Sequence, residues 1–165
     1  MQGKVARPNT LSSAQIGAAG VLLVQYKLLK NGIDSAPMTT DDGIDLVAYS
    51  PVQNAPLTIQ VKTNLAPKPA GGRGQPALDW WIPIKNPADL FALCDLSEER
   101  VWLFDRDGLA RNAQQQTVEK YHVCISLADS QRSRRTRSIQ EFEPFLLDYR
   151  IQGVFTGKVT CAADR

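Results

Sequence analysis

The 165-residue chain contains a single histidine, His122, and three cysteines that lie far apart, at positions 94, 124 and 161. A zinc site takes three or four Cys or His ligands at short spacings, so this composition argues against zinc. One histidine also argues against a Ser-His-Asp catalytic triad. A small, odd number of scattered cysteines is typical of a reducing compartment, and we expect a cytoplasmic protein.

Long hydrophobic runs and a strong excess of one charge are also missing. No run is long enough to span a bilayer, and residues 1–10 lack the apolar core of a signal peptide, so we expect no membrane association. The net charge is +2, so any contact with nucleic acid must come from local basic clusters. The GGRG run at 71–74 is not followed by Lys-Ser/Thr, which argues against a phosphate-binding loop.

What remains is an ordinary globular composition, with 43% hydrophobic and 22% charged residues. The length suits one domain with its own core. We predict a single domain over residues 1–165. Within it, residues 1–11 form a flexible arm, and residues 64–77, rich in Gly, Pro and basic side chains, form a flexible loop without helix or strand.

The first predicted element is a helix with a clear start and stop. Ser12 with Gln15 three residues later is a capping box, and Asn31-Gly32 ends the helix near Lys30. Its middle, GAAGVLLV, is apolar nearly all round, which predicts a buried helix. Gln25 projects from the apolar stripe, either as a boundary residue or as a polar group aimed at the end of a sheet.

Alternating and apolar runs predict the remaining elements. We expect strands within 33–42 and at 45–49, 57–63, 78–84, 91–96, 101–104 and 121–127, a short helix within 107–117 and a helix from about 139 to 149.

The stretch from Gly43 to Thr63 carries the most chemistry. Asp45 leads one strand, and on the next strand Gln60 and Lys62 share a face while Val61 lies on the other. A half-buried lysine is costly unless something pairs with it or uses it. The simple structural interpretation is that Lys62 pairs with Asp45.

This order of helix, Asp-led strand and strand ending in Gln60-Val61-Lys62 resembles the PD-(D/E)xK nuclease superfamily, particularly its restriction-endonuclease-like and Holliday-junction-resolvase-like members. The resemblance covers residues 12–64 well. It implies an α/β fold with a restriction-endonuclease-like αβββαβ core, in which a mixed central sheet is flanked by helices. It also implies metal-dependent endonuclease activity on DNA, with Mg²⁺ or Mn²⁺ as cofactor. Such nucleases often cut two strands as dimers, so a homodimer is a further expectation.

The resemblance also implies roles for individual residues. Asp45 is the main metal ligand, joined by the amide oxygen of Gln60 and the carbonyl of Val61, and Lys62 is the catalytic lysine. Asp42 and Gln25 are accessory candidates. The candidate nucleic-acid contacts are the basic residues Lys27, Lys30, Lys68, Arg73, Arg134 and Arg135.

Two departures from the superfamily pattern keep an alternative open. Gln60 stands where Asp or Glu is usual, which removes one charge from the metal site. Val21 stands where related helices commonly carry Glu. The alternative is a catalytically weakened nuclease fold that acts as a nucleic-acid-binding or protein-interaction module.

Overall fold

The computed structural model describes residues 11–40, 42–49, 55–127 and 137–156. The predicted arm therefore lies outside the described residues, apart from Leu11. Helix α1 (Ser13–Lys30) begins and ends where the sequence predicts. Its capping box is formed, because the Ser12 hydroxyl accepts from the Gln15 N–H at 3.3 Å and Gln15 Oε1 accepts from the Ser12 N–H at 2.8 Å.

A mixed five-stranded sheet, sheet A, forms the centre of the molecule. Its strand order is β1-β2-β3-β6-β7, with β3 and β6 parallel and the other neighbours antiparallel. Its strands are β1 (Asp34–Pro37), β2 (Leu46–Tyr49), β3 (Leu57–Asn64), β6 (Leu90–Asp95) and β7 (Arg100–Asp105). The predicted α/β class with a mixed central sheet is confirmed.

A second sheet, sheet B, packs on sheet A. Its order is β10-β9-β5-β4, and β8 also pairs with β9. Its strands are β4 (Lys68–Pro69), β5 (Pro76–Pro83), β8 (Gln115–Gln116), β9 (Lys120–Ser126) and β10 (Arg137–Ser138). The prediction that residues 64–77 contain no helix or strand is wrong, because β4 pairs with β5 and a 3₁₀ turn, η1 (Ala70–Gly72), lies between them.

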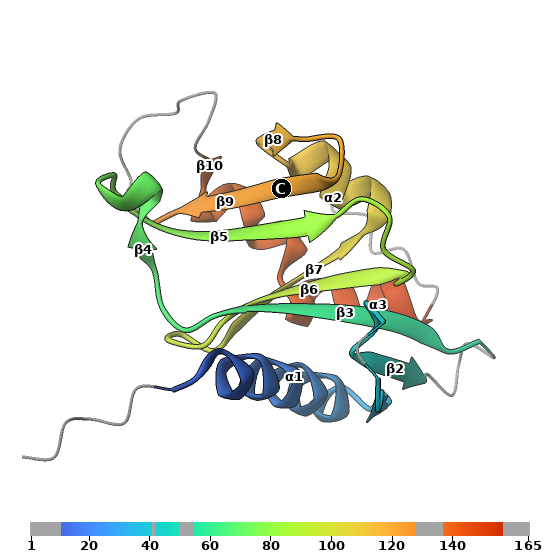
Figure 1. Cartoon of the computed structure of the whole chain (residues 1–165). Coiled ribbons are helices and arrows are strands. Elements are labelled where there is room, and N and C mark those ends of the chain that lie inside the picture. The colour runs from blue at the N-terminus through green and yellow to red at the C-terminus, as the bar shows by residue number, and fades with distance from the viewer. Residues whose placement is uncertain (1–10, 41, 50–54, 128–136, 157–165) are drawn as a thin grey trace, which may run out of the picture.

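The molecule has three layers, with α1 and α3 on one face of sheet A and sheet B on the other (Figure 1). The core between sheet A and the helices is aliphatic and includes Val24, Leu28 and Ile59. The core between the two sheets is rich in aromatic residues, including Trp80 and Trp102. Trp80 is buried and Trp81 is exposed, because neighbouring residues of a strand point to opposite faces of the sheet.

The helices differ from the sequence prediction in three places. The helix expected from 139 to 149 is a 3₁₀ segment, η2 (Ile139–Phe145), followed by α3 (Leu147–Thr156). Pro144 lacks the N–H that a continuous α-helix requires there. The short helix α2 (Arg106–Asn112) ends earlier than expected. Helix α1 is not buried all round, because its outer face is exposed in this chain. Among the described residues, no helix is both long and apolar enough to cross a membrane.

Separate segments of the chain pair with successive parts of the outer edge of β9. Strand β8 pairs with its first half and β10 with its last two residues. Between them the Gln114 side chain behaves like a strand backbone, since its Nε2 donates to the Cys124 carbonyl at 2.9 Å and its Oε1 accepts from the Cys124 N–H at 2.7 Å.

Candidate active site

Asp45 is held against the edge of β3 at the point where the pairing with β2 ends. Gly43 precedes it with φ +85°, a conformation that favours glycine, and packs so closely on Asn86 that a Cβ would lie 2.8 Å from the Asn86 amide. The Asp45 N–H donates to the Ile59 carbonyl at 2.9 Å. Asp45 Oδ2 accepts from the Val61 N–H at 2.6 Å, which fixes the carboxylate beside β3.

Gln60 is the next residue along this edge. Leu46 pairs with Ile59, so Asp45 continues the register beside Gln60. The Gln60 side chain is 3% exposed, and its Oε1 is buried without a hydrogen-bond partner among the described residues. An unsatisfied buried acceptor costs about 1–3 kcal/mol, so this oxygen is placed where a donor or cation would be favourable.

Lys62 lies two residues further along β3 and is half-buried. The structural interpretation in which it pairs with Asp45 is not observed. No ion pair joins these two residues, both of which the structure describes. The Lys62 amine therefore remains available for another anion.

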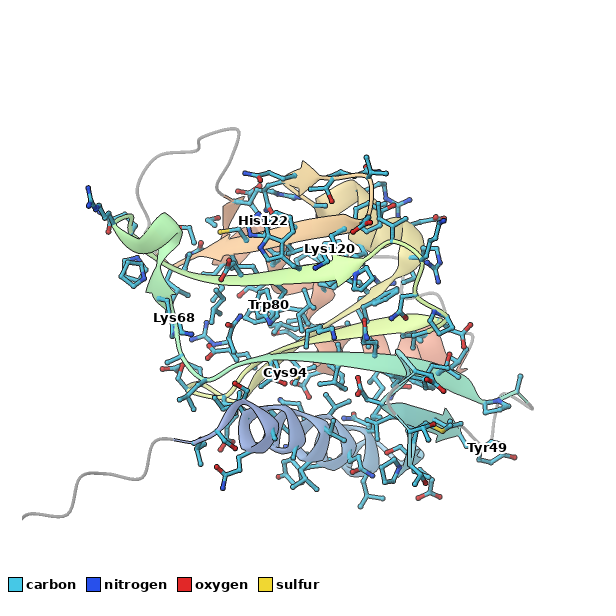
Figure 2. All side chains as sticks on the ribbon, viewed as in Figure 1. Tyr49, Lys68, Trp80, Cys94, Lys120 and His122 are labelled. Carbon is cyan, nitrogen blue, oxygen red and sulfur yellow. The ribbon has the colours of Figure 1, made fainter. Side chains whose placement is uncertain are left out.

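Asp45, Val61 and Lys62 line one open hollow of about 420 Å³, the site hollow. Its wall is formed by Ser13, Ile16, Gly17, Asp45, residues 61–65 and Lys68. Lys68, labelled in Figure 2, lies on the connection that leads from β3 to β5. The first turns of α1 add the positive end of the helix dipole to the same wall. The site hollow thus combines one carboxylate with two lysines.

The two accessory candidates lie outside the site hollow. Gln25 Nε2 donates to the Ser35 carbonyl at 3.3 Å, so its amide holds α1 to β1. Gln25 lines a neighbouring hollow of about 410 Å³ together with Val21 and Asp45. Asp42 is exposed and lines neither hollow.

The predicted nucleic-acid contacts separate into two groups. Lys27 and Lys30 occupy the last turns of α1, about 15–20 Å along the helix from Gly17, the last α1 residue that lines the site hollow. Lys27 is also already paired with Asp148 at 2.9 Å. Lys68 and Arg73 share the β3–β5 connection, with Lys68 lining the site hollow. Arg134 and Arg135 lie outside the described residues.

A cation in this region would have few charged ligands. Among the described residues, no three His, Cys, Asp or Glu side chains are grouped so that they could hold a metal ion. Asp45 offers one carboxylate, while Gln60 and the Val61 carbonyl offer neutral oxygens. An all-oxygen set suits Mg²⁺ or Mn²⁺, and the single carboxylate predicts weak binding. The buried, unpartnered Gln60 oxygen is the observation that fits a cation here.

Sequence reasoning missed the residues that bring α1 against β3. Gly20 lies so close to Thr63 that a Cβ on it would be 1.9 Å from Thr63 Oγ1. Asn64 Nδ2 donates to the Asp79 carbonyl at 2.8 Å, which ties the end of β3 to β5. Small residues such as Gly20 in a helix allow another element to approach closely, but nothing in the sequence identifies the strand that α1 meets.

The comparisons with known proteins bear on the fold. No protein-family model matches the sequence, and no curated protein matches it. A solved structure of a bacterial homing endonuclease is similar, with a TM-score of 0.55 and 18% identity over 85% of this chain and 90% of that chain. At that identity the similarity shows a shared fold, so the chain has an endonuclease-like fold.

Proposed function

We propose that this protein is an endonuclease that hydrolyses DNA phosphodiester bonds at the site hollow, in the manner of the PD-(D/E)xK superfamily. The observation that carries the proposal is the placement of Asp45, Val61 and Lys62 around one hollow. Gln60, which precedes Val61 on β3, does not line this hollow, but its buried side-chain oxygen has no hydrogen-bond partner among the described residues. The similar solved structure is that of a homing endonuclease, which supports DNA as the substrate class.

Each residue has a task that follows from its position. Lys62 lines the hollow and forms no ion pair within the described residues, so its ammonium attracts a phosphate and stabilises the negative charge that builds up during hydrolysis. Lys68 lines the same wall and Arg73 follows nearby, so both bind the backbone phosphates beside the scissile one. Asp45 is orientated by the Val61 N–H, which keeps its carboxylate at the β3 edge.

The proposed cofactor is Mg²⁺ or Mn²⁺, held by Asp45, the Gln60 amide oxygen and the Val61 carbonyl. When bound, it would supply a nucleophile at neutral pH and offset phosphate charge. Because Gln60 brings no charge, we expect activity only at millimolar metal concentrations.

The test is nicking of supercoiled plasmid with Mg²⁺ or Mn²⁺. We expect Lys62→Ala and Asp45→Asn each to reduce the rate at least about 100-fold, as loss of a charge-stabilising group does. Asp45→Asn keeps an oxygen that can accept from the Val61 N–H, so it tests charge rather than folding. Lys120→Ala, at an exposed lysine of β9 that does not line the site hollow, is the matched control and should retain full activity. Equal cutting by wild type and Lys62→Ala would reject the proposal.

A second candidate function is nucleic-acid binding without cleavage. It is favoured by the single carboxylate of the site hollow and by Val21, an apolar residue, in the hollow next to it. Gel-shift titrations over a salt series distinguish the two functions. Binding that weakens steeply with salt, with no nicking at any metal concentration, would favour the binding module. A reduced salt slope in Lys68→Ala, but not in Lys120→Ala, would place the contact at the site hollow.

A further inference from the structure

The outer face of α1 carries an exposed apolar row. Leu22, Tyr26 and Leu29 are 66%, 60% and 64% exposed, and a contiguous exposed apolar patch, unlike a single exposed side chain, marks an interaction site. Ala18 is exposed one turn before Leu22. These four residues, spaced four, four and three apart, form a continuous row along the helix, which we call the α1 ridge.

The α1 ridge is the face of a largely apolar helix that the described residues leave uncovered. The inner face of α1 is buried through Gly20, Val24 and Leu28. No charged residue occurs in α1 before Lys27, and Lys27 is neutralised by Asp148. A helix that is apolar on both faces is stable in water when both faces are covered. The sequence of α1 therefore calls for a second apolar surface of low charge.

The surface beside the ridge has the shape to receive the ridge itself. The hollow of about 410 Å³ that includes Gln25 and Asp45 is bordered on the α1 side by Ala18 and Leu22, and on the opposite side by Met38. Met38 is 45% exposed and lines this hollow together with Ala18. An apolar depression therefore lies next to Ala18, the smallest residue of the α1 ridge. A projecting side chain and a depression on the same surface are what an isologous contact requires.

We infer that the α1 ridge is the dimer interface of this protein, with two copies of α1 antiparallel about a two-fold axis at Leu22. In that arrangement Leu22 meets its own copy, and Tyr26 of the second copy lies opposite Ala18, where it fills the depression. Large residues then face small ones, as close packing demands. A parallel pair would set Ala18 against Ala18 and leave a gap.

Charge favours the same orientation. Antiparallel helices align their dipoles favourably, and each Lys30 lies near the uncharged first half of the other helix. A parallel pair would bring the two Lys30 ammonium groups together. The interface also borders the candidate site, because Asp45 lines both the depression and the site hollow. Tyr26 of the second copy would cover the α1 side of Asp45.

The first test is the mass in solution by sedimentation or light scattering. We expect wild type to have twice the chain mass at about 100 μM, and Leu22→Lys to have the mass of one chain. Val118→Lys, at a position 97% exposed and far from α1 in the fold, is the matched control and should remain a dimer. Circular dichroism should show the same fold in all three proteins. A monomeric wild type, or a dimeric Leu22→Lys, would overturn the inference.

The second test fixes the orientation by disulfide trapping in a Cys161→Ser background. Leu22→Cys should cross-link to itself under mild oxidation at least 10-fold faster than Val118→Cys. A mixture of Ala18→Cys and Tyr26→Cys should cross-link between the two variants faster than either does alone. Preferential self-linking of Ala18→Cys would indicate a parallel pair and overturn the antiparallel arrangement. Equal rates for Leu22→Cys and Val118→Cys would overturn the interface.

Discussion

The two faces of sheet A are packed in different ways. On the helix side, α1 approaches β3 closely at Gly20. The thiol of Cys94, labelled in Figure 2, donates to the Gly20 carbonyl at 3.9 Å. Burial raises the pKa of this thiol. On the other side, large rings fill the space to sheet B, with Trp80 and Trp102 in an edge-to-face contact at 5.9 Å. The core on the helix side is thus closely packed and mainly aliphatic, whereas the core between the two sheets is rich in aromatic residues.

The two faces of sheet A are therefore expected to contribute differently to stability and to the candidate active site. Large rings bury the most apolar area, so the aromatic face should dominate the free energy of unfolding. The close approach of α1 brings the first turns of the helix to the edge of β3, where Asp45 and Lys62 line the site hollow. Changes on the two faces should therefore have different consequences, which three variants can test.

The largest effect is expected on the aromatic face. Trp102 is fully buried, so Trp102→Ala should lower the free energy of unfolding by about 3–5 kcal/mol in urea denaturation. Trp81 is its matched control, since it is 43% exposed and stacks on His122 at 4.2 Å on the outer face of sheet B. Trp81→Ala should lose less than about 1.5 kcal/mol. Equal losses would contradict the proposed division between the faces.

A smaller effect is expected where α1 meets β3. In Gly20→Ala the new Cβ would overlap the Thr63 side chain, so α1 must shift, at about 1–3 kcal/mol. Gly17→Ala has no atom within 4 Å of the added Cβ and should instead gain up to about 1 kcal/mol from helix propensity. Thermal unfolding should order the three proteins accordingly. Adding Thr63→Ala to Gly20→Ala should recover part of the loss, and no recovery would place the strain elsewhere.

The smallest effect concerns Asp105, which links the two faces. Its carboxylate caps α2 through the Gly108 N–H at 2.6 Å and binds Arg150 of α3 at 2.8 Å. Burial alone would raise the pKa of Asp105, but these two hydrogen bonds lower it below its usual range. A lowered pKa stabilises the fold above the unfolded-state value near 4 and loses that stabilisation as pH falls through the folded-state value.

The comparison for Asp105 is therefore the pH dependence of stability. Asp105→Asn should lower the free energy of unfolding at pH 7 by about 1 kcal/mol, a modest value because the side chain is 44% exposed and partly screened. The difference from wild type should shrink between pH 5 and pH 2 in urea denaturation. A difference that is independent of pH would mean that the carboxylate charge contributes nothing.

Local signals in the sequence predicted much of the fold. The Ser12–Gln15 capping box located the start of α1, and alternation of apolar residues located β3. The family resemblance implied that Asp45 and Lys62 share one site. Both line the site hollow, while their catalytic roles stay predictions. These signals succeed because they act over a few neighbouring residues.

Features that depend on distant partners were not predictable in the same way. Strand β4 is two residues long and exists through pairing with β5, so its sequence alone looks like a loop. Strands β5 and β9 pair across about 40 intervening residues, which no periodicity reports. The burial of Gln60 likewise depends on the packing of sheet B on sheet A. The exposure of the α1 ridge depends on which surfaces pack on α1.

The occupied outer edge of β9 also affects the tendency of this protein to aggregate. An open strand edge recruits other chains and is a common route to aggregation. Here the Gln114 amide forms hydrogen bonds with both the N–H and the carbonyl of Cys124. The gap between β8 and β10 therefore leaves neither backbone group of Cys124 open for pairing with an incoming strand. Hydrolysis of this one carboxamide to a carboxylate would keep the acceptor for the Cys124 N–H but remove the donor to the Cys124 carbonyl, which would leave that carbonyl open to an incoming strand.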